Sequence, residues 1–331
     1  MGNNQKWIRL AAVGAALASA VSLAVWIAPR LSKQPALFSF LMYLETGRVP
    51  GKPEAPTTPP SVPTEPSAPP EATAPAEPEP PLTLSEKDLD DVSVLYRCDY
   101  RPALEPLMRQ PLNWDLADGE PAVLILHTHG SECYTPAPGE IFSQQEPYRT
   151  LDNDHNMISL GRELAQLLEA GGIRVIHDTR CHDEPDYNRS YINARAAIEE
   201  YLRQYPTIRM VLDLHRDASA DPENQLVTAA TVGGQRSAQL LLMTGTDAGG
   251  NHHPNWKENL SLGLKLTAVL EQAYPGICRP VTLRSERFNT DLTPGSLLVE
   301  VGAAGNTREE ARIAIHALAD GILTLAKGAN R

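Results

Sequence analysis

The sequence lacks the closely spaced cysteine pairs of a zinc knuckle and the excess of positive charge typical of nucleic-acid-binding proteins. It contains four cysteines but no two of them separated by two residues, which excludes a zinc knuckle built on thiolates. Its 331 residues carry a formal net charge of −12, whereas a protein that wraps nucleic acid is expected to present a basic face. We therefore expect no nucleic-acid partner.

Charged residues are missing from one apolar stretch near the N-terminus, Leu10 to Ala28. About 20 apolar residues of helix span the hydrocarbon core of a membrane, and Trp7 and Trp26 lie near its two ends, where indole rings favour the interface. We expect an uncleaved transmembrane anchor within residues 1–33, and the alternative is a cleaved secretory signal. Both interpretations place the rest of the chain outside the cytoplasm, and the first makes it a single-pass cell-membrane protein.

The next segment, residues 34–84, has little that could form a core. From Gly51 to Leu82 the chain consists mainly of Pro, Glu, Ala, Thr and Ser. Such a composition favours extended polyproline conformations over a packed structure. We expect an extracytoplasmic Pro-rich linker here, which would hold the following domain at a distance from the membrane.

Residues 85–331 have a globular composition and alternate between strand-like and helix-like patterns. Short apolar runs predict buried strands, and apolar residues at helical spacing, ended by Gly or Pro, predict helices. This alternation predicts an α/β fold with a mainly parallel sheet and helices on both faces. The expected strands are 122–126, 173–176, 208–214 and 297–301, with two more inside 227–243 around a Gly-Gly pair, and the expected helices are 157–168, 191–205, 256–274 and 307–326.

Polar residues directly follow the first of these strands. His129 and Glu132 form an H-x-x-E pair in the sequence HTHGSE. Imidazole and carboxylate are good ligands for zinc, and a loop leaving a strand can bring both to one ion. The alternative is an ordinary polar turn, but two histidines and a glutamate at the end of a strand favour a metal site.

A second polar cluster, Asp213-Leu-His215-Arg-Asp217, ends the strand 208–214. Strand alternation places Asp213 and His215 on the same side. Sites in open α/β sheets gather at the carboxyl ends of strands, so His215 is the expected third metal ligand. Asp213 or Asp217 would then hold the other nitrogen of its ring.

Glu300 lies inside an apolar strand, where a bare charge is costly to bury. Near zinc it could accept a proton from bound water and deliver it to a leaving amine. The alternative is a structural pair with Arg284 or Arg287. A further carboxylate, Asp152, precedes a helix, where it is either an N-cap or a metal ligand.

These motifs resemble the stage II sporulation protein P family. The resemblance covers roughly His127 to the C-terminus, and the motifs that carry it are HTHGSECY, DHNMISLGRELAQLL, HDEPDYNRSYINAR, LDLHRDA, HPNWKENL, YPGICRP, FNTDLTPGSLLVEVG and NTREEA. That family is similar to zinc-dependent N-acetylmuramoyl-L-alanine amidases, which implies an amidase-like (phosphorylase/hydrolase-like) fold. In the amidases two histidines and a carboxylate hold zinc beside a catalytic glutamate. By position His129, His215 and Glu300 fit these roles, while Glu132 and Asp152 both remain open for the carboxylate.

The resemblance implies a zinc-dependent peptidoglycan hydrolase that acts on the septal wall during engulfment, with the stage II proteins D and M as partners. Glu300 would be the catalytic glutamate, and Arg216 would help to stabilise the oxyanion. Two alternatives stay open. One is a zinc carboxypeptidase or endopeptidase that cuts stem peptides, and the other is a membrane-tethered scaffold that binds the wall without cutting it.

Overall fold

The computed structural model describes residues 89–112, 116, 119–221 and 223–329. The expected anchor, the whole of the expected linker and residues 85–88 of the expected catalytic domain lie outside the described residues. Within the described residues, no helix combines the length and the apolar character needed to cross a membrane.

The described chain alternates between strands and helices, as the sequence predicts. Its elements are, in chain order, β1 (Val94–Arg97), α3 (Leu104–Arg109), β2 (Val123–Leu126), α4 (Met157–Ala170), β3 (Val175–His177), α5 (Ser190–Gln204), β4 (Met210–Asp217), β5 (Ala230–Val232), β6 (Gln235–Ser237), β7 (Leu240–Thr244), α6 (Trp256–Ala273), β8 (Val281–Arg284), β9 (Ser296–Ala303) and α7 (Arg308–Ala329).

Seven strands form one sheet in the order β1-β8-β7-β9-β4-β2-β3. All neighbouring strands in it are parallel except β7 and β9, which are antiparallel. The sheet therefore consists of two parallel groups that run in opposite directions. The carboxyl ends of β2, β4 and β9 meet at one edge, and those of β1, β7 and β8 meet at the other.

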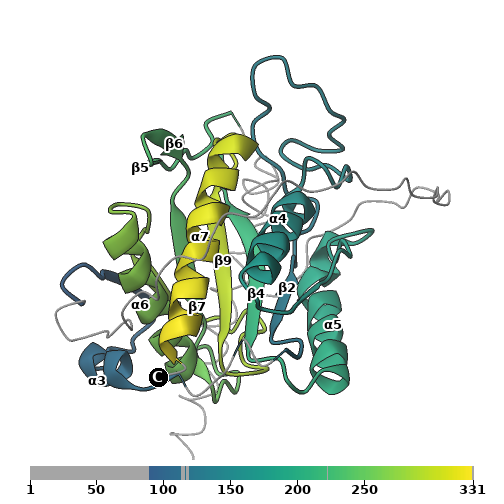
Figure 1. Ribbon diagram of the computed structural model, residues 1–331. Coiled ribbons are helices and arrows are strands. Elements are labelled where there is room, and N and C mark those ends of the chain that lie inside the picture. The colour runs from purple at the N-terminus through teal and green to yellow at the C-terminus, as the bar shows by residue number, and fades with distance from the viewer. Residues whose placement is uncertain (1–88, 113–115, 117–118, 222, 330–331) are drawn as a thin grey trace, which may run out of the picture. The chain divides into compact units, whose positions relative to one another are not determined.

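Helices cover both faces of this sheet, which confirms the expectation. In β2, Val123 and Ile125 pack with α4 and α7 in the main core, whereas Leu124 and Leu126 pack with α5 on the opposite face. Every residue of β2 is buried, as expected for a strand covered on both sides. Figure 1 shows α4, α6 and α7 in front of the sheet and α5 at its right-hand side.

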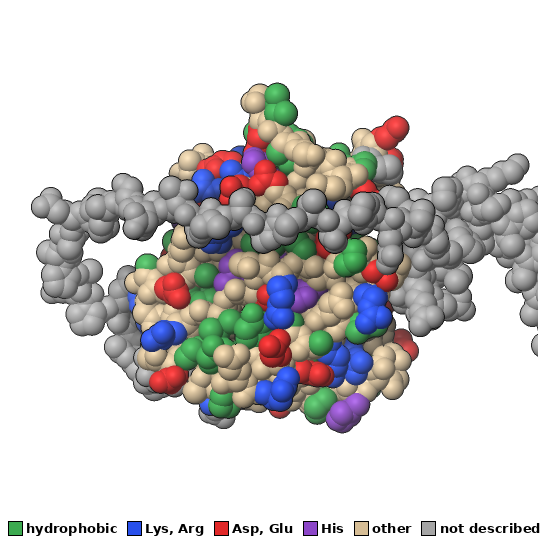
Figure 2. Space-filling model, turned by 90° about the vertical axis from the view of Figure 1, so that its right-hand side faces the viewer, with side chains coloured by type: hydrophobic (Ala, Val, Ile, Leu, Met, Phe, Trp, Pro, Cys, Tyr) green, Lys and Arg blue, Asp and Glu red, His purple; other side chains and the backbone are tan. Residues whose placement is uncertain are grey.

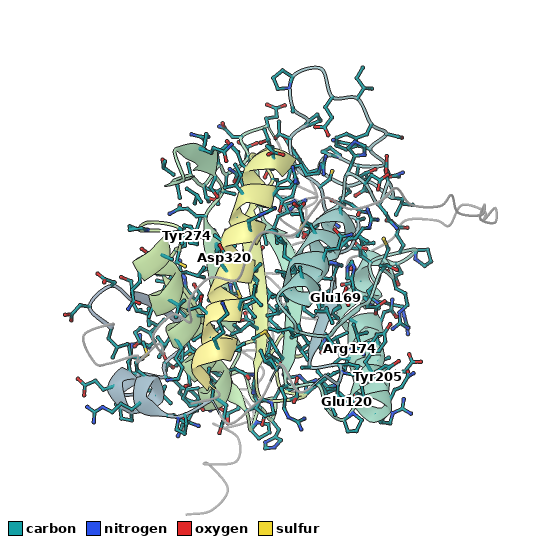
Figure 3. The ribbon with its side chains drawn as sticks, viewed as in Figure 1. Glu120, Glu169, Arg174, Tyr205, Tyr274 and Asp320 are labelled. Atoms are coloured by element: carbon teal, nitrogen blue, oxygen red, sulfur yellow. The ribbon has the colours of Figure 1, made fainter. Side chains whose placement is uncertain are left out.

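Helix ends follow local sequence signals. The side chain of Asn156 caps α4 by accepting a hydrogen bond from the amide of Ile158, and the helix ends at the expected Gly pair, where Gly172 has a φ of +91°. At its C-cap, α6 is tied to α7 because the hydroxyl of Tyr274 donates to Asp320 (Figure 3).

One expected region differs from the structure. Residues 227–243 contain three strands rather than two, because β5 and β6 pair around Gly233 and Gly234 as a separate hairpin, and β7 joins the main sheet. The short elements β1, α3 and β8 were not predicted either. Each has four to six residues, too few for periodicity to distinguish them from loops.

Candidate active site

Two neighbouring parallel strands, β4 and β9, carry the first part of the site. His215 is the direct register partner of Glu300. Asp213 shares the face of His215 because strand side chains alternate, while Leu214, between them, packs in the main core. The strand-end position predicted for His215 and Glu300 is therefore the position that brings them side by side.

The turn after β2 adds His129 to this pair. Thr128 donates to the carboxylate of Asp213 through both its amide, at 2.8 Å, and its hydroxyl, at 2.6 Å. This anchors the turn against β4 and places the ring of His129 edge-on to that of His215, with the ring centroids 5.3 Å apart. Both imidazoles are almost completely buried.

Glu132 is three residues after His129 in the same segment, and its side chain also lies beside His215. Its Oε2 is 3.8 Å from Nδ1 of His215 and accepts a hydrogen bond from the backbone amide of Arg216 at 3.2 Å. Because Glu132 is also buried, its carboxylate is held between the two strand ends. The pair His129 and Glu132 predicted from the sequence is thus brought together with His215.

Asp152, the other carboxylate left open by the sequence, lies elsewhere. Its Oδ2 is 2.9 Å from Nδ1 of His155, and Nε2 of His155 is 3.4 Å from Glu140. Asp152 is largely exposed, and it accepts a hydrogen bond from the amide of Asp154. Asp152 therefore lies in the loop before α4 and is not the N-cap of that helix, which is Asn156.

Arg216 is buried and its side chain contacts the protein itself. Its Nε donates to the carbonyl of Cys133 at 3.1 Å, Nη2 donates to that of Tyr148 at 3.0 Å, and Nη1 lies 3.4 Å from Oε1 of Glu132. A guanidinium held in this way fixes Glu132. Its predicted role at the oxyanion stays a prediction.

Three residues beside the site were missed by the sequence analysis. Tyr187 stacks on His129 with ring centroids 4.6 Å apart, and the guanidinium of Arg149 lies 4.6 Å from the centre of the Tyr187 ring. Arg149 also pairs with Asp183 at 3.0 Å and lies 3.6 Å from Glu132. Arg149 and Asp183 come from two loops and Tyr187 begins a short 3₁₀ helix, Tyr187–Arg189, and nothing in the spacing of the sequence signals that these segments meet.

Burial and neighbouring charges shift the pKa values of three side chains in the site. Burial acts to lower the pKa of His215, but the carboxylate of Asp213, 3.0 Å from Nε2, outweighs it and raises the pKa to about 9. Burial and the neighbouring His215 hold the pKa of His129 well below its usual value. Removal from bulk water raises the pKa of Glu300 to about 8, and the carboxylate of Glu132 acts in the same direction.

Three buried atoms of the site have no hydrogen-bond partner among the described residues, Nδ1 of His129, Nε2 of His215 and Oε2 of Glu300, although Oδ1 of Asp213 lies 3.0 Å from Nε2 of His215. Two imidazoles and a carboxylate match zinc in chemical type, and such unpaired buried atoms are costly unless something binds them. No group of three or more His, Cys, Asp or Glu side chains in the described ranges has its donor atoms gathered around one point as a metal requires. The residues therefore fit zinc by type, and their side chains must turn for the donor atoms to converge.

His127, Arg284 and Arg287, which the sequence placed near the site, make their contacts away from His129, His215 and Glu300. His127, the first histidine of the motif, lies on the other face of the sheet, where its Nε2 is 3.0 Å from Nε2 of His177. Arg284 pairs with Glu286 and Arg287 with Asp291, so neither makes the structural ion pair considered for Glu300. On the face seen in Figure 2, acidic, basic and apolar side chains are interspersed, and histidines lie among them.

Several solved structures show weak likeness to this chain. The CwlD amidase from Clostridioides difficile, in complex with the GerS lipoprotein, is 16% identical with a TM-score of 0.38, covering 62% of this chain and 98% of that one. The N-acetylmuramoyl-L-alanine amidase AmiC2 of Nostoc punctiforme is 14% identical with a TM-score of 0.35, covering 61% of this chain and 95% of that one. A metallo-carboxypeptidase from Burkholderia cenocepacia is 10% identical with a TM-score of 0.35, covering 67% of each chain. TM-scores this low establish neither a shared fold nor a shared site.

Sequence comparison is more specific. The Stage II sporulation protein P of Bacillus subtilis (strain 168) is 27% identical over 209 residues, which are 60% of this chain and 49% of that protein. The chain thus matches about half the length of this curated relative. The family model described as Stage II sporulation protein P (SpoIIP) matches residues 64–323, which is well over half of the chain. The chain belongs to the stage II sporulation protein P family.

Proposed function

We propose that this protein is a zinc-dependent peptidoglycan hydrolase, an N-acetylmuramoyl-L-alanine amidase with an amidase-like fold. The observation that carries the proposal is the meeting of His129, Glu132, His215 and Glu300 at the carboxyl ends of β2, β4 and β9. Two imidazoles with one carboxylate and a separate glutamate are the groups of a hydrolytic zinc site. Membership of the sporulation family supports the cell wall as substrate.

In this proposal His129, Glu132 and His215 hold the metal. Bound zinc would polarise the scissile carbonyl and lower the pKa of a bound water. Asp213 orients the ring of His215 from 3.0 Å, an arrangement that typically fixes the tautomer of a ligating histidine. Arg216 holds Glu132 through its backbone amide and its guanidinium, so it acts as a positioning residue.

Glu300 is the proposed general acid and base. It is the register partner of His215, its Oε2 has no hydrogen-bond partner among the described residues, and the residue remains partly open to solvent. A carboxylate so placed can take up a proton at Oε2 and return it to the departing amide nitrogen. Neither Arg284 nor Arg287 competes for it.

The rest of the chain fits an enzyme of the septal wall. We propose that residues 1–33 anchor the protein in the cell membrane, that residues 34–84 form the spacer, and that residues 85–331 form the catalytic domain in the intermembrane space of sporulating cells. The apolar stretch and the Pro-rich composition support this layout. Family membership supports the stage II proteins D and M as partners.

A digest of purified cell wall tests the proposal. The wild-type chain is expected to release stem peptides cut between muramic acid and L-alanine, identified by mass spectrometry. Glu300→Gln should lower the rate about 10²–10⁴-fold because it removes the proton-transferring group. Glu163→Gln, which changes a remote carboxylate paired with Arg312, is the matched control and should keep the wild-type rate. Full activity of the Glu300→Gln protein would refute the assignment.

A second activity is favoured by the position of Glu132. The His129-x-x-Glu132 spacing with a later histidine is similar to the ligand order of zinc carboxypeptidases, and the structure brings Glu132 to 3.8 Å from His215. Cleavage within the stem peptide in the same digest would identify this activity. Wall binding without any cleavage, unchanged by His129→Ala, would identify a scaffold.

A further inference from the structure

A cleft of about 690 Å³ lies at the other edge of the sheet. It is lined by the segment that follows β1, by Asp247 after β7, and by the start of α6. Because β7 runs antiparallel to β9, this edge is opposite to the one that carries His215 and Glu300. The cleft is therefore separate from the proposed catalytic site.

Two aromatic rings form part of the cleft wall. Tyr100 and Trp256 lie with ring centroids 5.4 Å apart and planes inclined by 34°. Both are partly buried against the apolar cluster under α6, which holds the rings in place, and both line the cleft. Aromatic rings fixed at an open surface offer a flat apolar face together with a polar edge.

The charges that line the cleft balance each other. Asp99, Asp247, Arg101 and Lys257 all line the cavity, and Lys257 has its Nζ 5.4 Å from the centre of the Trp256 ring. Equal numbers of acids and bases give no net attraction for a polyanion or a polycation. They do supply both acceptors and donors for a neutral ligand with many polar groups.

Asp247 provides an acceptor that the described protein does not use. Its Oδ1 is buried, and no hydrogen-bond partner for this atom lies among the described residues. The carboxylate also accepts a hydrogen bond from the hydroxyl of Tyr100, which raises the pKa of that hydroxyl. A buried unpaired carboxylate oxygen is satisfied when a ligand hydroxyl donates to it.

We propose that the cleft formed by Tyr100, Trp256 and Asp247 is a carbohydrate-binding site that takes a pyranose unit of a glycan strand. A pyranose has one apolar C–H face, which suits stacking on the aromatic pair, and a rim of hydroxyls, which suits the mixed charges. The volume lies within the range of about 300–1,000 Å³ found for small-ligand sites. The identity of the glycan as cell wall rests on the proposed function. The site then holds the strand while the opposite edge cuts.

Binding of N-acetylglucosamine tetramer to the full chain tests this site, with titration calorimetry as the measurement. Trp256→Ala is expected to weaken binding at least tenfold because it removes the stacking surface, and Asp247→Ala at least fivefold because it removes the acceptor. Tyr274→Phe, at the other end of α6, is the control and should bind like the wild type. Asp247 is only partly buried and lies outside the helices and strands, so its variant tests the proposal even where Trp256→Ala fails to fold.

The outcomes separate this site from the proposed function. Binding that needs Trp256 and is unchanged in Glu300→Gln supports the cleft, even where no wall hydrolysis is found. The proposal is overturned if the Asp247→Ala protein and the Trp256→Ala protein both bind the N-acetylglucosamine tetramer with wild-type affinity. Binding of a proline-rich peptide at this cleft, with no binding of the sugar, overturns it as well, because aromatic grooves also recognise polyproline helices.

Discussion

The two faces of strands β4 and β9 differ sharply in chemistry, although their residues alternate along the same short stretches of sequence. On one face Leu212, Leu214 and Val299 join the main core under α4 and α7. On the other face, the residues in alternate positions include His215 and Glu300. The first face is apolar at these positions, whereas the second combines the buried Val211 and Leu298 with the residues of the proposed site.

This contrast shows how the fold tolerates a cluster of buried charges. The apolar face buries enough surface to hold the strands in register, at roughly 25 cal/mol per Å². The polar face can then contain groups that are costly to bury. The strands and the core beneath them hold His215 and Glu300 in position.

The largest expected effect on stability compares one residue from each face. Leu214→Ala should lower the free energy of unfolding by about 2–5 kcal/mol, because it leaves a cavity in the core. Glu300→Gln should leave it unchanged or raise it, because a neutral amide replaces a partly buried carboxyl whose Oε2 is buried and unpaired. Chemical denaturation measures both. A large loss of stability in Glu300→Gln would break the division between the two faces.

The second comparison uses two glycines that face the sheet from helices of the same side. A methyl group at Gly161 would collide with the rings of His127 and His177, the latter at 2.5 Å, whereas one at Gly263 would only touch Val281 and Leu297 at 3.6 and 3.7 Å. Gly161→Ala should destabilise by about 1–3 kcal/mol. Gly263→Ala should be neutral or stabilise by up to about 1 kcal/mol. Melting temperatures of both variants give the answer, and equal melting temperatures would contradict the close packing over this histidine pair.

The smallest expected effect concerns the surface pairing of α4 and α7. Glu163 accepts from Arg312 at 2.8 Å and lies 2.8 Å from His316, and although burial acts to raise its pKa, these partners hold it below the usual value. A lowered carboxyl pKa contributes stability above about pH 4.3, the unfolded value, and that contribution is lost as the pH falls through the folded pKa.

Solvent screens this pair, so we expect less than about 1 kcal/mol. The difference in unfolding free energy between the wild type and Glu163→Gln should therefore be present at pH 7 and disappear under acidic conditions. A difference that grows as the pH falls would have the wrong sign for this pairing.

Much of the fold follows from the sequence because its signals are local. Apolar runs fixed β2 and β9, and the Gly pair after Ala170 ended α4 where expected. The antiparallel pairing of β7 with β9 was not predictable in this way, because it depends on which edge a strand joins. The two strands expected around the Gly-Gly pair are β5 and β6, and the third strand, β7, was not predicted as a separate element.

In the candidate site, too, local sequence signals identified some residues, and the fold brought in others that the sequence did not indicate. Strand-end position was enough to identify His129, His215 and Glu300 as neighbours, since alternation and strand ends are local properties. Tyr187 and Arg149 were missed because two separate segments bring them to His129. The sequence left Glu132 and Asp152 open because it does not give the positions of their loops, and the structure brings Glu132 to 3.8 Å from His215.

Zinc content is the measurement that tests the central claim most directly. After loading with zinc and dialysis, the wild type and Glu300→Gln should each retain about one zinc ion per chain, because three protein ligands typically hold a catalytic zinc. His215→Ala should retain none while remaining folded by circular dichroism. A wild type that retains no zinc, or a His215→Ala protein that retains it fully, would contradict the account.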